Sequence, residues 1–138
     1  MIIMWMSFGY FEDSEERLVL KKVFDALKPG GRFLMELLNR DFLIRNFAAR
    51  DEKVVDGIKV IEEREFDILT SRVRGTITRH EKSGPIVKQT FWRIYSAHEL
   101  KNLLEGIGFS FTAAYGNLQR EPLSLETRLM RLVFEKRC

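Results

Sequence analysis

Two apolar runs separated by one amphipathic segment open the chain, and this order constrains the fold more than any other feature. The first run, Met1–Met6, has the length of a strand and does not alternate between apolar and polar residues. Such a run is typical of a strand that is buried on both faces, as in a parallel sheet. The second run, Arg32–Asn39, is predicted to be the next strand.

The segment between the two runs carries the signals of a helix. Asp13, with Glu16 three residues later, matches a helix-start pattern. Lys28–Gly31 contains a Pro that cannot continue a helix and a Gly that accepts a left-handed cap. Strand, helix and strand together predict a βαβ unit with a right-handed crossover. The apolar residues at helical spacing are Leu20, Val23, Phe24 and Leu27.

The middle of the chain, at about residues 56–95, predicts an antiparallel β-meander. It contains an acidic strand, Ile58–Asp67, a basic strand, Arg72–Arg79, and a third strand, Ile86–Tyr95. The basic side chains are either a nucleic-acid patch or cross-strand partners of the acidic strand, and we favour the second interpretation. The stretch before the meander, Asp41–Asp56, is predicted to be irregular. The basic side chains in question are Arg72, Arg74 and Arg79.

The last part of the chain predicts one helix and two further strands. Ser96–Glu99 has the capping-box pattern, and Gly108 ends the helix that follows it. Phe109–Tyr115 and Arg128–Lys136 are predicted strands, with a loop at Gly116–Leu125 between them. The chain is therefore predicted to be a single α/β domain, residues 1–138, in which the meander is an insertion.

Composition limits the class of protein. A chain of 138 residues has the length of one domain, and 45% hydrophobic residues is too many for a disordered tail. No apolar run approaches the roughly 20 residues of a membrane helix. The only cysteine is Cys138, which excludes an internal disulfide and a cysteine metal cluster. We expect a cytoplasmic protein without a metal, and the net charge of +3 favours nucleic acid only slightly as a partner.

Motifs of several enzyme classes are absent from these 138 residues. There is no P-loop, no His-Glu-x-x-His and no Gly-x-Ser-x-Gly, and Gly106–Gly108 lies at a helix end rather than between a strand and a helix. His80 and His98 are expected to face solvent. Glu36 lies among apolar residues in the middle of a predicted strand. Three interpretations of Glu36 are open: a buried functional acid, a residue at the rim of the sheet, and the partner of an arginine.

Several segments together resemble class I methyltransferases, which use S-adenosylmethionine. Leu27–Phe33 is similar to the link between the family's fourth helix and fifth strand. Tyr95–Leu100 followed by Leu104–Phe109 is similar to the family's last helix and its entry into the sixth strand. The resemblance covers nearly the whole chain. It implies part of a Rossmann-like methyltransferase sheet, from the fourth strand onward, with the meander as the substrate-side insertion of small-molecule members.

One part of the family pattern has no counterpart here. In the family the cofactor lies on a glycine-rich loop after the first strand, and an acid at the end of the second strand binds the ribose. These elements would precede Met1, so the resemblance implies a truncated product, a fragment or one half of a split enzyme. The family's fourth strand lies between the first and the fifth. Met1–Met6 would therefore be an exposed apolar edge that pairs with a second copy, as a homodimer, or with another chain.

The resemblance also implies where the cofactor and the substrate bind. Ser7 and Phe8 would contact S-adenosylmethionine. Aromatic rings suit a cationic methyl donor, and methyl transfer from a sulfonium needs mainly alignment and the exclusion of water. No general base is identified, and each candidate side chain also has an ordinary structural interpretation. The substrate pocket would be lined by Tyr10, Asn39, Arg40, Arg93 and Tyr95.

Three functions from different classes are open at this point. The first is a methyltransferase that acts on a small molecule and is competent only when the cofactor half is supplied. The second is a non-catalytic, dimeric interaction module derived from a methyltransferase. The third is a nucleic-acid binder built on the basic strand of the meander.

Overall fold

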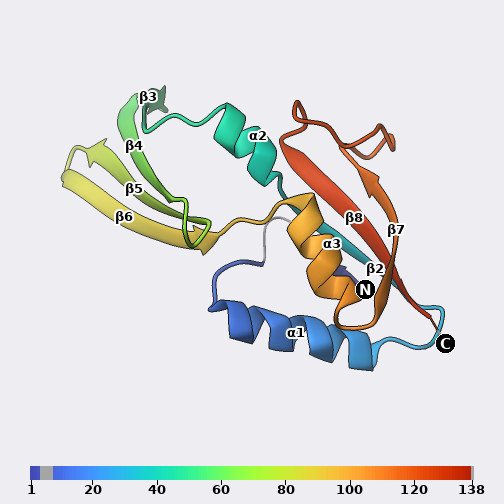
Figure 1. Cartoon of the computed structure of the whole chain (residues 1–138). Helices are drawn as coiled ribbons and strands as arrows, with labels where there is room; N and C mark the ends of the chain where they lie inside the picture. Colours follow the sequence, from blue (N-terminus) through green and yellow to red (C-terminus); the bar gives the residue numbers. More distant parts are fainter. Residues whose placement is uncertain (4–7, 138) are drawn as a thin grey trace. The chain divides into compact units, whose positions relative to one another are not determined.

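The structure of the chain is a computed structural model that describes residues 1–3 and 8–137 (Figure 1). It divides into two compact units. One unit consists of Met1–Arg45 and Ile94–Cys138 and contains the described helices, and we call it the helical unit. The other, Asn46–Arg93, is the meander unit. The predicted meander, at about 56–95, lies mostly in this second unit, whereas its being an insertion and the assignment of the chain to a single domain stay predictions.

A four-stranded sheet with the order β1-β2-β8-β7 forms the centre of the helical unit. β1 (Ile2–Ile3) runs parallel to β2 (Arg32–Leu38), with α1 between them along the chain, which confirms the predicted βαβ order for the described residues. β8 (Leu129–Lys136) lies between β2 and β7 (Phe109–Tyr115) and is antiparallel to both. The two predicted C-terminal strands are therefore confirmed.

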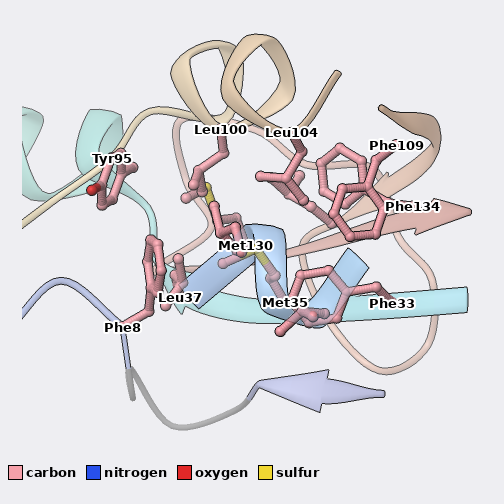
Figure 2. Close-up of a cluster of buried hydrophobic side chains, with 13 residues drawn as sticks. Phe8, Phe33, Met35, Leu37, Tyr95, Leu100, Leu104, Phe109, Met130 and Phe134 are labelled. Atoms are coloured by element: carbon pink, nitrogen blue, oxygen red, sulfur yellow. The ribbon is translucent and has the colours of Figure 1, made fainter. Parts of the chain in front are cut away.

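Helices cover one face of this sheet. The described residues of the unit form α1 (Asp13–Ala26), α2 (Arg40–Arg45) and α3 (Ala97–Glu105). α1 and α3 place their apolar residues in a common core with alternate residues of β2 and β8 (Figure 2). Burial of one large apolar side chain stabilises a fold by about 1.5–3 kcal/mol, so this layer is the main source of the unit's stability. The core residues on these elements are Leu20, Val23, Phe33, Met35, Leu37, Leu100, Leu104, Met130, Leu132 and Phe134.

A β-bulge in β7 keeps two of its side chains on this core. The register against β8 shifts between Phe111 and Ala113, and both Phe111 and Ala114 pack against the core. In a regular strand, residues three apart point to opposite faces. The extra residue, Thr112, restores the inward direction for Ala114. The rings of Phe111 and Phe134 then meet edge to face, with their centroids 5.7 Å apart.

The opposite face of the sheet carries an ion pair. Glu36 of β2 and Arg131 of β8 are cross-strand neighbours, and both are nearly buried. Nε of Arg131 lies 2.7 Å from Oε2 of Glu36, as an ion pair without the alignment of a hydrogen bond. Nη1 of Arg131 also donates to the carbonyl of Gly116 at 3.0 Å. Of the three interpretations of Glu36, the structure supports the one in which an arginine pairs with it.

The two long helices both begin with a capping box. In α3 the N-cap is Ser96, whose Oγ accepts the N–H of Glu99 while the Glu99 carboxylate accepts the N–H of Ser96, as predicted. In α1 the N-cap is Glu12, which pairs in the same way with Glu15. The helix thus begins at Asp13, but its N-cap is the preceding residue, Glu12, rather than Asp13 as the sequence pattern predicts.

The meander unit is an antiparallel sheet in which each strand pairs with the next. Its strands are β3 (Arg50–Val55), β4 (Ile58–Asp67), β5 (Arg72–Glu81) and β6 (Gly84–Arg93). The acidic, basic and third predicted strands correspond to β4, β5 and β6. The predicted meander is therefore confirmed, with one further strand.

The prediction that Asp41–Asp56 is irregular is wrong. α2 covers Arg40–Arg45, and β3 pairs along its whole length with β4. All residues of β3 are exposed, so no apolar pattern marks this strand in the sequence. Asp56 and Gly57 both have positive φ angles, of 53° and 76°, and form the two-residue turn that joins β3 to β4. Such a turn has the twist that a tight antiparallel hairpin requires.

The environment of β1 differs from the prediction. Ile2 is 60% exposed and Met1 is 52% exposed, so the predicted burial on both faces is wrong for these residues. Among the residues that the structure describes, β1 pairs with β2 alone. The terminal amino group of Met1 donates to the carbonyl of Arg32 at 2.8 Å. The remainder of the predicted strand, residues 4–6, lies outside the described residues.

Lys136 of β8 closes the carboxyl end of α1. Its Nζ donates to the carbonyl of Phe24 at 2.7 Å and to that of Leu27 at 2.8 Å. The same ammonium lies 4.6 Å from the centroid of the Phe24 ring. The last carbonyls of a helix have no partner within the helix, and the negative end of the helix dipole attracts a cation. Lys136 thus serves as a long-range cap.

Replacement of Lys136 by Met should lower the free energy of unfolding by about 1–3 kcal/mol, because the carbonyls lose a charged donor. Denaturant titration measures this loss. Lys21→Met is the matched control, since Lys21 is 63% exposed and pairs with Asp25 on the surface of α1. We expect a change of less than about 1 kcal/mol there. Equal losses in the two variants would contradict the capping role.

Candidate functional site

The carboxyl ends of β1 and β2 lie at the same edge of the sheet, because the two strands are parallel. In open α/β sheets, ligands bind outside the carboxyl ends of the strands. The loop Phe8–Phe11 comes after β1 along the chain, and Asn39 comes directly after β2. Of the two residues predicted to contact the cofactor, Ser7 lies outside the described residues.

The structure brings together two of the predicted site residues, Phe8 and Tyr95. Their ring centroids are 5.5 Å apart, their planes are tilted by 36°, and each residue is only 5% exposed (Figure 2). Figure 2 also shows Leu37 of β2 beside Phe8. Both rings belong to the buried core, where tilted ring contacts are favourable. A role of either ring in cofactor or substrate binding stays a prediction.

A glutamate that the sequence analysis assigned to a helix start instead binds the Phe8–Phe11 loop. Glu16 is 1% exposed, and its Oε1 accepts the backbone N–H of Gly9 at 2.8 Å and that of Phe11 at 3.0 Å. Gly9 has a φ of 108°, a conformation that glycine adopts without strain. The only sequence signal for this contact is a glutamate in the first turn of the helix that follows the loop.

Two aromatic residues of this loop, Tyr10 and Phe11, have side chains that face solvent. Tyr10 is 60% exposed and Phe11 is 58% exposed. Tyr10, a predicted pocket residue, is therefore accessible to a ligand in the helical unit. Phe11 is equally accessible, although the sequence analysis did not select it.

The side chain of Asn39 is bound by the protein itself. Its Nδ2 donates to the carbonyl of Ser124 at 3.0 Å and to that of Thr127 at 2.9 Å, and its Oδ1 accepts the N–H of Asp41 at 3.1 Å. The carboxamide thus connects the end of β2, the start of α2 and the loop before β8. Arg40 is the first residue of α2 and is half-buried. The roles of Asn39 and Arg40 toward a substrate stay predictions.

The meander unit contains a polar hollow of about 460 Å³. Arg50 pairs with Glu52 and Glu63, and Nζ of Lys53 lies 2.9 Å from Oε1 of Glu62. The hydrogen bond from Lys53 holds the pKa of the Glu62 carboxyl below its usual value. These cations of β3 thus have carboxylate partners within the unit. The hollow is lined by Ala49, Arg50, Glu63, Arg64, Glu65, Arg74 and Thr76.

The basic strand is β5, and its register places Arg72 opposite Asp67 and Arg74 opposite Glu65. The guanidinium carbons of Arg72 and Arg74 lie 5.4 Å and 5.6 Å from the centroid of the Phe91 ring. This is a cation–π arrangement within the sheet. The contacts favour a structural role for these arginines over a nucleic-acid patch.

Arg93, the remaining predicted pocket residue, is the last residue of β6 in the meander unit. It is half-buried and is the cross-strand neighbour of Arg72. Its role toward a substrate stays a prediction.

The histidines lie as expected, because His80 and His98 are both exposed. Nε2 of His98 lies 3.1 Å from Nδ2 of Asn102, one turn further along α3. Within residues 1–3 and 8–137, no group of three or more side chains of metal-binding type lies together. The helices of this same part of the chain are too short and too polar to cross a membrane.

Solved structures of S-adenosylmethionine-dependent methyltransferases have the same fold. The CcbJ methyltransferase from Streptomyces caelestis matches with a TM-score of 0.82 at 16% identity, over 95% of this chain and 53% of that chain. A methyltransferase from Clostridium acetobutylicum matches with a TM-score of 0.83 at 15% identity, over 99% and 57%. An amino pentose methyltransferase from Micromonospora echinaspora matches with a TM-score of 0.65 at 14% identity, over 98% and 56%.

The chain therefore spans about half the length of the solved structures that it matches. No protein-family model and no curated protein matches the sequence. The predicted class I methyltransferase fold is thus supported by structure, in a mixed α/β chain with two sheets.

Replacement of Asn39 by Asp should lower the free energy of unfolding by about 2–4 kcal/mol. A buried carboxylate would face the two carbonyl oxygens that the amide now bonds. Urea titration measures the loss. Asn102→Asp, on the exposed surface of α3, is the matched control, with an expected change of less than about 0.5 kcal/mol. An Asn39→Asp chain as stable as the wild type would show that the three contacts of Asn39 are not formed in solution.

Proposed function

We propose that the chain is part of an S-adenosylmethionine-dependent methyltransferase that acts on a small molecule. The observation that carries this proposal is the match of 95–99% of the chain to methyltransferase structures. The sheet of the helical unit then corresponds to part of a Rossmann-like sheet, from its fourth strand onward, and the meander unit to the substrate-side insertion. A cytoplasmic location remains part of the same proposal.

The acceptor is proposed only as a class. One similar structure is an amino pentose methyltransferase, which supports a small polar acceptor. Arg40 and Tyr95 of the helical unit are candidates for orienting an acidic group on such a molecule, and Arg93 of the meander unit is a separate candidate. Among the described residues none is assigned as a general base.

The cofactor would supply an electrophilic methyl group together with its leaving group. The protein then has to align the acceptor with that methyl group and exclude water. In the helical unit, the exposed ring of Tyr10 offers a face to a cation, and Phe8 anchors the same loop in the core through Tyr95. Phe8 therefore supports the candidate site from within the core.

The residues present fit the cofactor only in part. The aromatic loop suits the sulfonium group, but the 138 residues contain no glycine-rich loop between a strand and a helix. Such a loop is what holds the phosphates or the nucleoside part of comparable cofactors in α/β folds. We propose that residues outside these 138, in the same polypeptide or in another, complete the cofactor site.

Calorimetry with S-adenosylmethionine tests the proposal. We expect weak but saturable binding by the chain, because it supplies only part of the proposed site. Binding should be about two- to fivefold weaker still in Tyr10→Ala, because an exposed cation–π contact is worth about 0.5–1 kcal/mol. Leu118→Ala is the control, since Leu118 is 70% exposed in the loop after β7. Absence of binding by the wild-type chain would contradict cofactor binding by these residues and would favour the second candidate.

The second candidate is a non-catalytic interaction module that forms a homodimer or binds another chain through the first strand. The observation that favours it is the exposure of Met1 and Ile2 on a strand that, among the described residues, pairs on one side only. Exposed apolar strand edges are sites of pairing with other chains.

Light scattering during gel filtration tests this second candidate. We expect a dimer that Ile2→Lys converts to a monomer, because a charge on an edge strand opposes pairing. Val54→Lys is the matched control, since Val54 is 72% exposed on β3 of the meander unit. A wild-type chain that stays monomeric at high concentration contradicts pairing between copies.

A further inference from the structure

The side chain of Glu16 is buried in the helical unit and has no role in the proposed chemistry. Glu16 lies in the first turn of α1 and is 1% exposed. Burial of a carboxylate is costly unless hydrogen bonds replace its water. The N–H groups of Gly9 and Phe11 do this at Oε1, with distances of 2.8 Å and 3.0 Å. Both bonds end on the same oxygen, so what they require of residue 16 is an acceptor oxygen at this position.

These two hydrogen bonds act on a short stretch of backbone. They hold the residues on either side of Tyr10, and Gly9 supplies the positive φ of 108° that the bend needs. At the start of the same loop, Phe8 packs on Tyr95 in the core. The loop is therefore held at both ends, by apolar packing of Phe8 and by the hydrogen bond from the N–H of Phe11 to Glu16.

The fixed backbone determines where the loop side chains point. Phe8 is directed into the core, whereas Tyr10 and Phe11 are directed to solvent. Two large aromatic side chains are thus exposed on a loop that cannot turn them inward without breaking the bonds to Glu16. A ligand that contacts these rings does not have to order the loop first, and such preorganisation raises affinity.

We propose that Glu16 is a positioning residue, which fixes the Phe8–Phe11 loop so that Tyr10 and Phe11 are preset to contact the bound methyl donor. This inference rests on the proposed function, since the methyl donor is the ligand in question. We further infer that the length of the Glu16 side chain, rather than its charge, determines the affinity for this ligand. We call the two hydrogen bonds from Gly9 and Phe11 to Glu16 the clamp. Removal of the clamp should weaken binding of S-adenosylmethionine about tenfold.

The experiment compares three substitutions at one position in the full chain. Glu16→Gln keeps the length and an acceptor oxygen, whereas Glu16→Asp keeps the charge but is one methylene too short. Glu16→Ala removes both. Glu105→Ala is the control, because Glu105 is an exposed glutamate at the end of α3, away from this loop in the sequence. The rates of amide hydrogen exchange at Gly9 and Phe11 show whether their hydrogen bonds to Glu16 are formed. Titration with S-adenosylmethionine measures how the affinity for this ligand changes.

We expect slow exchange at Gly9 and Phe11 in the wild type, Glu16→Gln and Glu105→Ala, with affinities within about threefold of one another. Glu16→Asp and Glu16→Ala should lose this protection and bind about tenfold more weakly. Core amides, such as those of Leu104 and Met130, show whether a variant is folded. If Glu16→Ala is unfolded by that criterion, the inference is tested by comparing the amide protection and the affinity of Glu16→Gln with those of Glu16→Asp.

Two results would overturn the inference. One is retained protection at Gly9 and Phe11 in Glu16→Asp, and the other is lost protection with unchanged affinity. Failure of the proposed function looks different, because the wild type itself then binds no S-adenosylmethionine. In that case the ligand half of the inference falls with it, whereas the exchange data still show whether Glu16 holds the loop.

Discussion

The apolar layer between the β2–β8 strands and the two long helices is the interaction on which the helical unit depends. Two candidate site residues belong to this layer, since Phe8 enters it before α1 and Tyr95 enters it before α3, and Asn39 follows directly after β2. Close packing leaves little freedom for such side chains. The layer itself requires apolar volume and periodicity rather than particular residues. This explains how the fold is shared at 14–16% identity with proteins whose site residues can differ.

The sequence predicted those helices whose ends are capped by residues close together in the chain. α3 is the clearest case, since Ser96 and Glu99 are three residues apart and satisfy each other. At α1 two overlapping patterns compete, and the structure uses the one that starts at Glu12. The contacts of Glu16 could not be assigned from the sequence, because its partners are backbone N–H groups of the preceding loop, whose conformation no side-chain pattern specifies.

Features that depend on distant partners were not predictable from the sequence. β3 has no buried side chain, and its stability comes from pairing with β4 and from ion pairs such as Lys53 with Glu62. The amide of Asn39 bonds residues that lie 85 and 88 positions further along the chain. The sequence therefore does not distinguish this structural role from the binding of a substrate. The exposure of Ile2 likewise depends on which elements lie beside β1 rather than on the composition of the strand.

The order of strands in the sheet has a consequence for synthesis on the ribosome. β8 is made after every other strand of its sheet, yet it occupies the position between β2 and β7. Until it emerges, the inner edges of both neighbours lack their backbone partners, and Phe33 and Phe109 have no Phe134 to pack against. Nascent chains in this state are prone to misassociation. Until residues 129–136 have been made, the facing edges of β2 and β7 are therefore open to non-native pairing.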